Sequence, residues 1–177
     1  KMILLLSAFF VIGALYCVLY YCVDIYVVEK ALGNSVLSGL LTAIGTIASF
    51  IVGVLFGKIY IHTRRFMPVI FFLACGIGFL ALAFTQNGFI VASAAAIAGG
   101  AYGMSVSYYA MVITELVPES KMSLSMAFYQ VVFNVSIFLA PYFPIIIGIL
   151  TKNNSLSGSF VYIGSILVFG GALSLIM

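Results

Sequence analysis

The chain has 177 residues, of which 65% are hydrophobic and only 6% are charged. Soluble domains carry about 25% charged residues, and none of this length has an interior large enough to hide so much apolar side chain. This composition excludes a soluble globular protein. The net charge of +3 is therefore not taken as a sign of nucleic-acid binding, because in a membrane protein the positions of the cations indicate which loops are cytoplasmic. We expect the lipid bilayer, and no nucleic acid, among the partners of this chain.

Charged residues come in a few short clusters, and the intervals between them are as long as a bilayer is thick. A helix rises about 1.5 Å per residue, so about 20 apolar residues cross a hydrocarbon core about 30 Å thick. The intervals predict an all-α polytopic fold that forms one bundle, residues 1–177. Its six membrane-spanning helices are expected at residues 2–26, 36–58, 67–85, 89–114, 122–150 and 159–177.

The cations are divided unequally between the two ends of this bundle. Five of them, from the first residue and from the second and fourth loops, lie on one side, whereas Lys30 and Lys152 lie on the other. Because cytoplasmic loops are rich in lysine and arginine, the loop from Lys58 to Arg65 is predicted to be cytoplasmic. We expect an integral, multi-pass protein of the cell (inner) membrane.

The two halves of the sequence, residues 1–87 and 88–177, resemble each other weakly. Gly13-Ala14 with Tyr20-Tyr21 has a counterpart in Gly100-Ala101 with Tyr108-Tyr109. Two explanations stay open at this point: chance in so biased a composition, or two three-helix repeats of inverted topology, which are characteristic of secondary transporters. We also expect the sequence to be a piece of a longer chain, since it opens without an initiator Met and closes inside an apolar run.

Polar side chains at mid-membrane are costly, so they tend to face a cavity or a partner. They concentrate in the first, fourth and fifth spans, at the three- and four-residue spacings that share a helical face, whereas the third and sixth spans are expected to face lipid. The candidate solute-binding residues are Tyr16, Tyr20, Tyr102, Ser105, Tyr109, Gln130 and Asn134. Packing or interfacial anchoring is the alternative for the tyrosines, and the two stacked amides are the stronger candidates because they need partners.

Proline and glycine positions predict how the helices bend and pack. Pro141 and Pro144 lie inside the fifth span, where each removes a backbone hydrogen bond, so we expect a kink that acts as a hinge. The pairs Gly53-x-x-x-Gly57 and Gly99-x-x-x-Gly103 predict close approach of the second and fourth spans.

The sequence argues against an enzyme. The single histidine, His62, lies in the basic loop, so a membrane-embedded serine would lack its base, and the single aspartate, Asp24, cannot form an aspartyl pair. No carboxylate lies at mid-depth, so Asp24 is the candidate in this segment for a coupling carboxylate. The three cysteines have neither metal-ligand spacing nor a disulfide pattern, and we predict no metal and no cofactor.

The segment from Gly53 to Arg65 resembles the signature loop of the major facilitator superfamily, a glycine-rich helix end followed by basic residues. The segment Glu115–Glu119, continuing to Ala140-Pro141, looks like the corresponding loop and helix of many facilitators. The acidic residue and the later glycine of the signature are absent here. Such a degenerate loop is more typical of the C-terminal half of these transporters, so that half is favoured.

This resemblance implies one six-helix half of a larger transporter, whose partner is a second six-helix half or another copy. In the family the first, second, fourth and fifth helices of a half face the central path, and the third and sixth lie outside. Lys58, Arg64 and Arg65 would hold a cytoplasmic gate through contacts with carboxylates and helix ends. The alternative is that these cations only set the topology.

The predicted function is secondary transport of a small neutral or amphipathic solute, a metabolite or a drug-like compound, by alternating access, with efflux as one candidate direction. An anionic solute would favour arginine or lysine at mid-depth, and the predicted spans place none there. The alternative is a non-transporting membrane scaffold or sensor.

Overall fold

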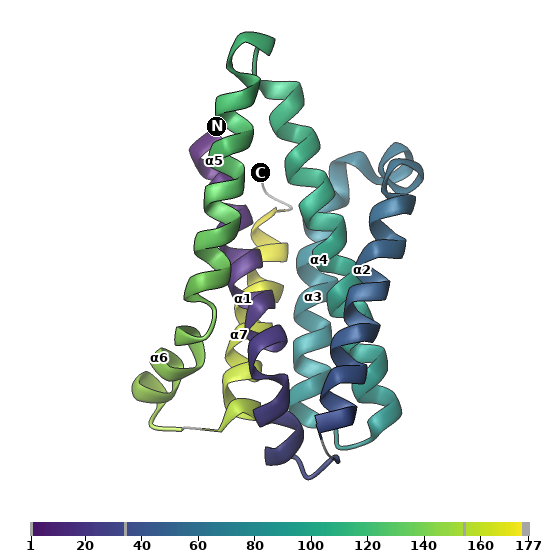
Figure 1. Cartoon of the computed structure of the whole chain (residues 1–177), viewed down its shortest axis with the longest axis vertical. Coiled ribbons are helices and arrows are strands. Elements are labelled where there is room, and N and C mark those ends of the chain that lie inside the picture. The colour runs from purple at the N-terminus through teal and green to yellow at the C-terminus, as the bar shows by residue number, and fades with distance from the viewer. Residues whose placement is uncertain (1, 34, 154, 175–177) are drawn as a thin grey trace.

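Seven α-helices and one short 3-10 turn run up and down a single bundle in the described part of the chain (Figure 1). The computed structural model describes residues 2–33, 35–153 and 155–174, and the side chain of Arg65 lies outside the described set. The elements are α1 (Met2–Glu29), α2 (Ser35–Thr63), η1 (Arg64–Phe66), α3 (Met67–Phe84), α4 (Gly88–Leu116), α5 (Glu119–Leu139), α6 (Tyr142–Thr151) and α7 (Leu156–Ser174). Within the described ranges there is no strand, and six helices are long and apolar enough to cross a membrane, which confirms the predicted fold.

The first two helices are longer than the apolar intervals from which they were predicted. α1 continues to Glu29 and α2 to Thr63, whereas the predicted spans ended at residues 26 and 58. An apolar interval marks only the part of a helix that crosses hydrocarbon, and the backbone hydrogen bonds continue into the polar boundary. The polar residues that follow these two apolar intervals therefore lie on the last turns of regular helices.

The fifth predicted span is broken into α5 and α6, which diverge in Figure 1. Without N–H groups, Pro141 and Pro144 cannot donate to the carbonyls of Ile137 and Ala140, four residues earlier. The N–H of Ala140 is shared between Ser136 O at 3.1 Å and Ile137 O at 3.3 Å, and the N–H of Phe143 donates to Ala140 O at 3.2 Å. The regular helical bonding is interrupted where these two donors are missing, and α5 ends at Leu139 before α6 begins at Tyr142. The predicted kink is therefore confirmed, and its role as a hinge stays a prediction.

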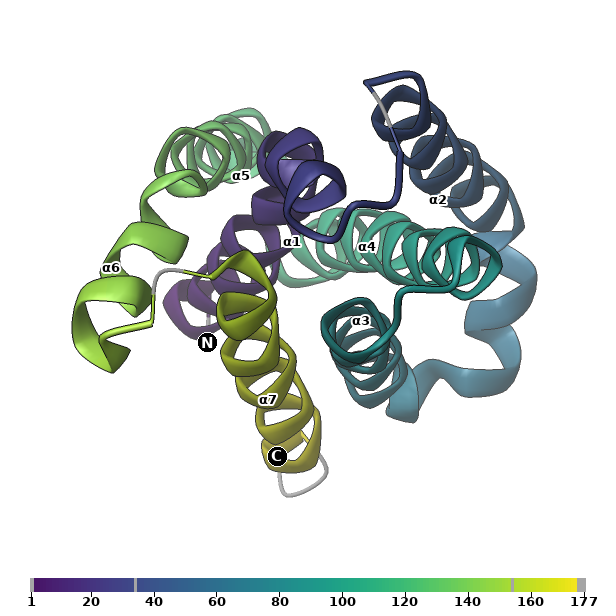
Figure 2. The same ribbon diagram turned by 90° about the horizontal axis from the view of Figure 1, so that it is seen from below.

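α1 and α4 form the centre of the bundle (Figure 2). α3 and α7 pack on each other on one side, and α2 and α5 flank α1 on the other. The most apolar stretches of α3 and α4 are 56% and 61% buried, whereas those of α2 and α5 are only 17% buried. The expectation that the third span faces lipid is therefore wrong, because α3 contacts both α4 and α7. Among the six long helices, α2 and α5 are the least covered.

Glycines set the closest helix contacts. A Cβ on Gly99 of α4 would collide with the backbone of Gly45 on α2, and one on Gly103 would collide with Ser49. The Gly99–Gly103 pair thus packs as predicted. In the Gly53–Gly57 pair only Gly53 lies near α4, where a Cβ would come within 3.8 Å of Ser107 Oγ, whereas a Cβ on Gly57 would meet no described atom within 4 Å.

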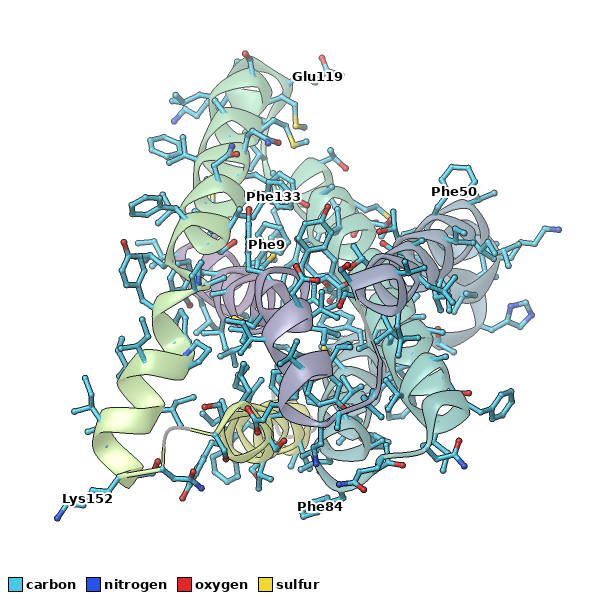
Figure 3. All side chains as sticks on the ribbon, turned by 60° about the horizontal axis from the view of Figure 1, so that its bottom comes forward. Phe9, Phe50, Phe84, Glu119, Phe133 and Lys152 are labelled. Carbon is cyan, nitrogen blue, oxygen red and sulfur yellow. The ribbon has the colours of Figure 1, made fainter. Side chains whose placement is uncertain are left out.

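Aromatic side chains divide into a buried set and an outward set (Figure 3). Phe9 of α1 is fully buried, and its ring centroid lies 4.5 Å from that of Tyr129 and 6.3 Å from that of Phe133 on α5. Phe50 and Phe84 point away from the bundle and are 71% and 76% exposed. The buried rings hold α5 to α1, and the outward rings give an apolar surface suited to lipid or to another membrane-embedded surface.

Candidate functional site

Two of the predicted tyrosines meet in the middle of the bundle. The rings of Tyr16 on α1 and Tyr102 on α4 are stacked, with 4.1 Å between their centroids and 14° between their planes. The hydroxyl of Tyr102 is buried and lies near the weakly bonding thiol of Cys17, and no described residue accepts or donates a hydrogen bond of normal geometry to it. A buried polar group without a partner costs free energy, so this hydroxyl is a place where a ligand or a water would be favoured.

The other two candidates on α4 are occupied by packing. Ser105 is fully buried and its hydroxyl donates to Tyr102 O at 2.7 Å. The ring of Tyr109 lies between Phe9 and Phe71, with centroid distances of 5.3 and 5.6 Å. In this conformation Ser105 and Tyr109 are therefore both part of the packed core, and packing was the alternative left open for Tyr109.

The remaining candidates lie on the outside of the described chain. Tyr20 is 53% exposed, and Gln130 and Asn134 are both exposed on α5. The side-chain amide of Asn134 donates to Gln130 O at 2.8 Å, so one of its hydrogen bonds is made within its own helix. The seven candidates thus form two groups, a buried one on α1 and α4 and an exposed one on α1 and α5.

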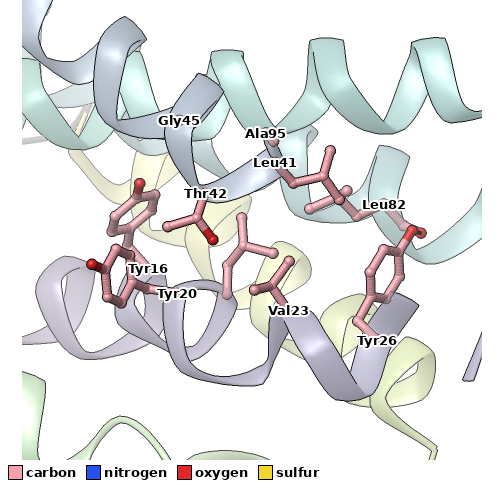
Figure 4. A pocket seen from close by; sticks show the side chains of 10 residues that line it. Tyr16, Tyr20, Val23, Tyr26, Leu41, Thr42, Gly45, Leu82 and Ala95 are labelled. Carbon is pink, nitrogen blue, oxygen red and sulfur yellow. Dashed lines mark hydrogen bonds between the residues drawn. The ribbon is translucent and has the colours of Figure 1, made fainter. Parts of the chain in front are cut away.

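A pocket lies between α1 and α2, and α3 and α4 each contribute one residue to it (Figure 4). The lining residues are Tyr16, Leu19, Tyr20, Val23, Tyr26, Leu41, Thr42, Gly45, Leu82 and Ala95, none of them charged. The hydroxyl of Thr42 donates to Ser38 O at 3.0 Å, and the hydroxyl of Tyr16 lies beside Gly45. Sequence reasoning missed Thr42 and Gly45, although Ser38, Thr42 and Gly45 share one face of α2 at helical spacing.

One ion pair joins α4 to the turn that follows α2. The guanidinium of Arg64 lies 3.4 Å from a carboxylate oxygen of Glu115 and 5.7 Å from the centroid of the Tyr60 ring. Tyr60 first, and then Glu115, raise the pKa of Arg64, which stays charged. Glu115 supplies the carboxylate that the basic loop itself lacks.

The other two predicted gate residues do not add to this contact. Lys58 is exposed, and its ammonium makes no hydrogen bond or ion pair with the described residues. The side chain of Arg65 lies outside the described set. Within the described ranges, no three His, Cys, Asp or Glu side chains gather in a way that could hold a metal ion.

Comparison with family models decides the relationship. Residues 1–141 match the model described as Major Facilitator Superfamily, from the first residue to the break between α5 and α6. The chain belongs to the major facilitator superfamily. A search of curated proteins found no match.

Members of this family are transporters of the major facilitator type, so the chain is an integral, multi-pass membrane protein of that type. Six apolar helices are consistent with one half of such a transporter. The preference for the C-terminal half, the internal repeat and the roles of the individual site residues stay predictions.

Proposed function

We propose that this facilitator chain is one half of a secondary transporter that moves a small neutral or amphipathic solute by alternating access. The observation that carries the proposal is the exposed surface of α2 and α5, each only 17% buried in its most apolar stretch. On α5 this surface includes the amides of Gln130 and Asn134. Because an amide facing lipid tails costs free energy, this surface needs a protein partner or a polar path.

The partner is a second six-helix half or another copy of the chain, placed against α1, α2 and α5. In that placement the amides of α5 and Tyr20 would lie next to the interface between the two halves, and the more buried Tyr16 would lie behind Tyr20 in the pocket. A path between two such halves opens alternately to each side when the halves rock. The lipid bilayer then covers the remaining apolar surface.

The chemistry of the groups at this face supports an uncharged or amphipathic solute. The pocket between α1 and α2 offers tyrosine rings, hydroxyls and aliphatic side chains, and none of its ten lining residues is charged. Aromatic faces bind apolar rings, and hydroxyls and amides supply a few hydrogen bonds that orient the solute. A fully ionised solute would find no counter-charge here.

Two features support a change of conformation. The break between α5 and α6 removes the backbone bonds that would keep the fifth span straight, so Pro141 and Pro144 are suited to act as a hinge. The Arg64–Glu115 pair ties α4 to the turn after α2, at the end that we place in the cytoplasm because of its basic residues. Breaking and remaking such an exposed pair costs little, which suits a gate.

Uptake by liposomes that contain the purified full-length protein tests this proposal. We would compare p-nitrophenyl glucoside, which is neutral and amphipathic, with p-nitrophenyl phosphate, which carries the same ring and is anionic. Saturable uptake of the neutral compound alone is expected. Saturable uptake of the phosphate alone would contradict the proposed solute class, and no saturable uptake of any solute in a wider panel would favour a scaffold or sensor.

A further inference from the structure

The last turn of α1 contacts the ends of two other helices, at the end of the bundle opposite the Arg64–Glu115 pair. The hydroxyl of Tyr26 donates to Leu82 O at 2.9 Å, and the ammonium of Lys30 donates to Ala83 O at 2.8 Å. Both carbonyls belong to the last turn of α3, where backbone oxygens have no partner within the helix. A cation is favoured there because the C-terminus of a helix carries partial negative charge.

The neighbouring residue, Glu29, reaches the start of α7. Its carboxylate accepts hydrogen bonds from Leu156 N at 2.7 Å, from Ser157 N at 3.2 Å and from Ser157 Oγ at 3.0 Å. The two backbone N–H groups belong to the first turn of α7, which lacks its own acceptors and carries partial positive charge. Hydrogen bonds to a carboxylate are among the stronger ones in proteins. Glu29 therefore joins the first and last spans of the bundle.

A tight turn at the end of α1 presents these side chains. The N–H of Ala31 donates to Val28 O and the N–H of Leu32 donates to Val27 O, both at 3.1 Å. This is the double bond pattern of a Schellman cap, and Ala31 adopts the left-handed conformation it requires, with φ of 52°. The backbone here is held at a conformation that alanine disfavours, so the position of the cap is set by the contacts around it.

From these contacts we infer that Tyr26, Glu29 and Lys30 form an interhelical clasp that fastens α3 and α7 to α1, so that the three helices move as one body at this end. The mobile part of this end is then α6, which has one buried residue among those described, Gly148, and whose Ile149 and Leu150 are 72% and 77% exposed. The clasp itself stands on the contacts alone. Its consequence for opening and closing rests on the proposed transport function.

Hydrogen exchange of the reconstituted protein, read by mass spectrometry, tests the clasp without any transport assay. Glu29→Ala removes all three acceptor contacts and should speed exchange of the Leu156 and Ser157 amides by at least about tenfold, given the strength of hydrogen bonds to charged groups. Asp24→Ala, on the same helix, is the matched control, because the exposed Asp24 carboxylate makes no such contact with the described residues. Exchange that is unchanged in Glu29→Ala would overturn the clasp.

A second variant keeps the inference testable if Glu29→Ala folds poorly. Glu29→Gln retains one carbonyl oxygen as acceptor and loses the charge, so it should give an intermediate rate of exchange. A rate equal to that of the unaltered protein in both variants would contradict the role assigned to Glu29.

Cross-linking tests the consequence for motion. In the double variant Glu29→Cys with Ser157→Cys, a short bifunctional thiol reagent would join α1 and α7 covalently. The native cysteines are buried, and the unaltered protein treated with the same reagent is the control. If the clasp stays closed during transport, solute flux survives cross-linking. Flux that is lost only after cross-linking would contradict the inference that α1, α3 and α7 move as one body. Absence of flux in the unaltered protein would instead overturn the proposed function and leave the exchange result to decide the clasp.

Discussion

The ring of Tyr16 stacks on the ring of Tyr102 at a centroid distance of 4.1 Å, and this contact joins the two central helices, α1 and α4. One side of the pair is packed against the core, where Ser105 bonds to the backbone of Tyr102. The other side meets the pocket between α1 and α2, which Tyr16 lines. The pair therefore stands between the structural core and the proposed solute path, with one hydroxyl that the described residues leave unsatisfied.

Removing that hydroxyl should not harm the fold. In Tyr102→Phe the stacked ring remains, and an unsatisfied buried group is lost, so we expect the free energy of unfolding to be unchanged or to rise by up to about 1–3 kcal/mol. Tyr129→Phe is the matched control: it deletes a hydroxyl that donates to Val106 O at 3.0 Å, and should lower stability by about 1 kcal/mol. Thermal unfolding in detergent checks both. A stability loss in Tyr102→Phe as large as in the control would show that this hydroxyl has a partner.

Close packing of α2 on α4 can be tested with a pair of glycines. Gly99→Ala places a methyl group in the backbone of Gly45 and should destabilise the protein by about 1–3 kcal/mol or more. Gly57→Ala meets open space and should be neutral or stabilising by up to about 1 kcal/mol, because alanine is the better helix former. The melting temperatures of the two variants decide the point. Equal melting temperatures would contradict the described crossing.

The Schellman cap of α1 predicts a stabilising change. Glycine adopts the left-handed conformation without the steric cost that alanine bears, so Ala31→Gly should raise the free energy of unfolding by about 1 kcal/mol. Ala31→Val, with a branched side chain at the same position, should lower it. Thermal unfolding of the pair provides the test, and a stability gain in the valine variant would rule out the cap geometry.

The Arg64–Glu115 pair makes a prediction about flux. Its side chains are 69% and 45% exposed, so neither Arg64→Ala nor Glu115→Gln should alter the melting temperature measurably. If the pair holds a gate, each change shifts the balance between the two conformations and alters the rate of solute flux. The double variant should then be no worse than the more affected single variant. Fully additive effects would show that the two residues act separately.

The six-span architecture could be predicted from the sequence because it depends on simple local features of the chain. Charged clusters bound six apolar intervals, and Pro141 and Pro144 lie inside the fifth, so the six spans and the broken fifth span could be predicted. These signals depend only on hydrophobicity and on missing N–H groups. They need no knowledge of which helix contacts which.

The contacts between helices could not be predicted in the same way. Gly45 is one glycine among 17, and nothing local distinguishes it from Gly57, which packs against nothing described. Glu29 and Lys30 read as residues that end a span, because the helix ends they cap are far away in sequence. Thr42 was missed since threonines in membrane helices commonly bond their own backbone, as this one does.

Saturable solute flux, measured in variants with substitutions on the exposed face of α5, tests the central claim most directly. The flux of a solute that the unaltered protein transports would be measured in liposomes with three forms of the full-length protein. These are the unaltered protein, the double variant Gln130→Ala with Asn134→Ala, and the control Val131→Ala with Val135→Ala on the same exposed helix. The account predicts saturable flux that the amide variant loses and the valine variant keeps, with both variants folded. Equal flux in the unaltered protein and the amide variant would contradict the assignment of the solute path to this face.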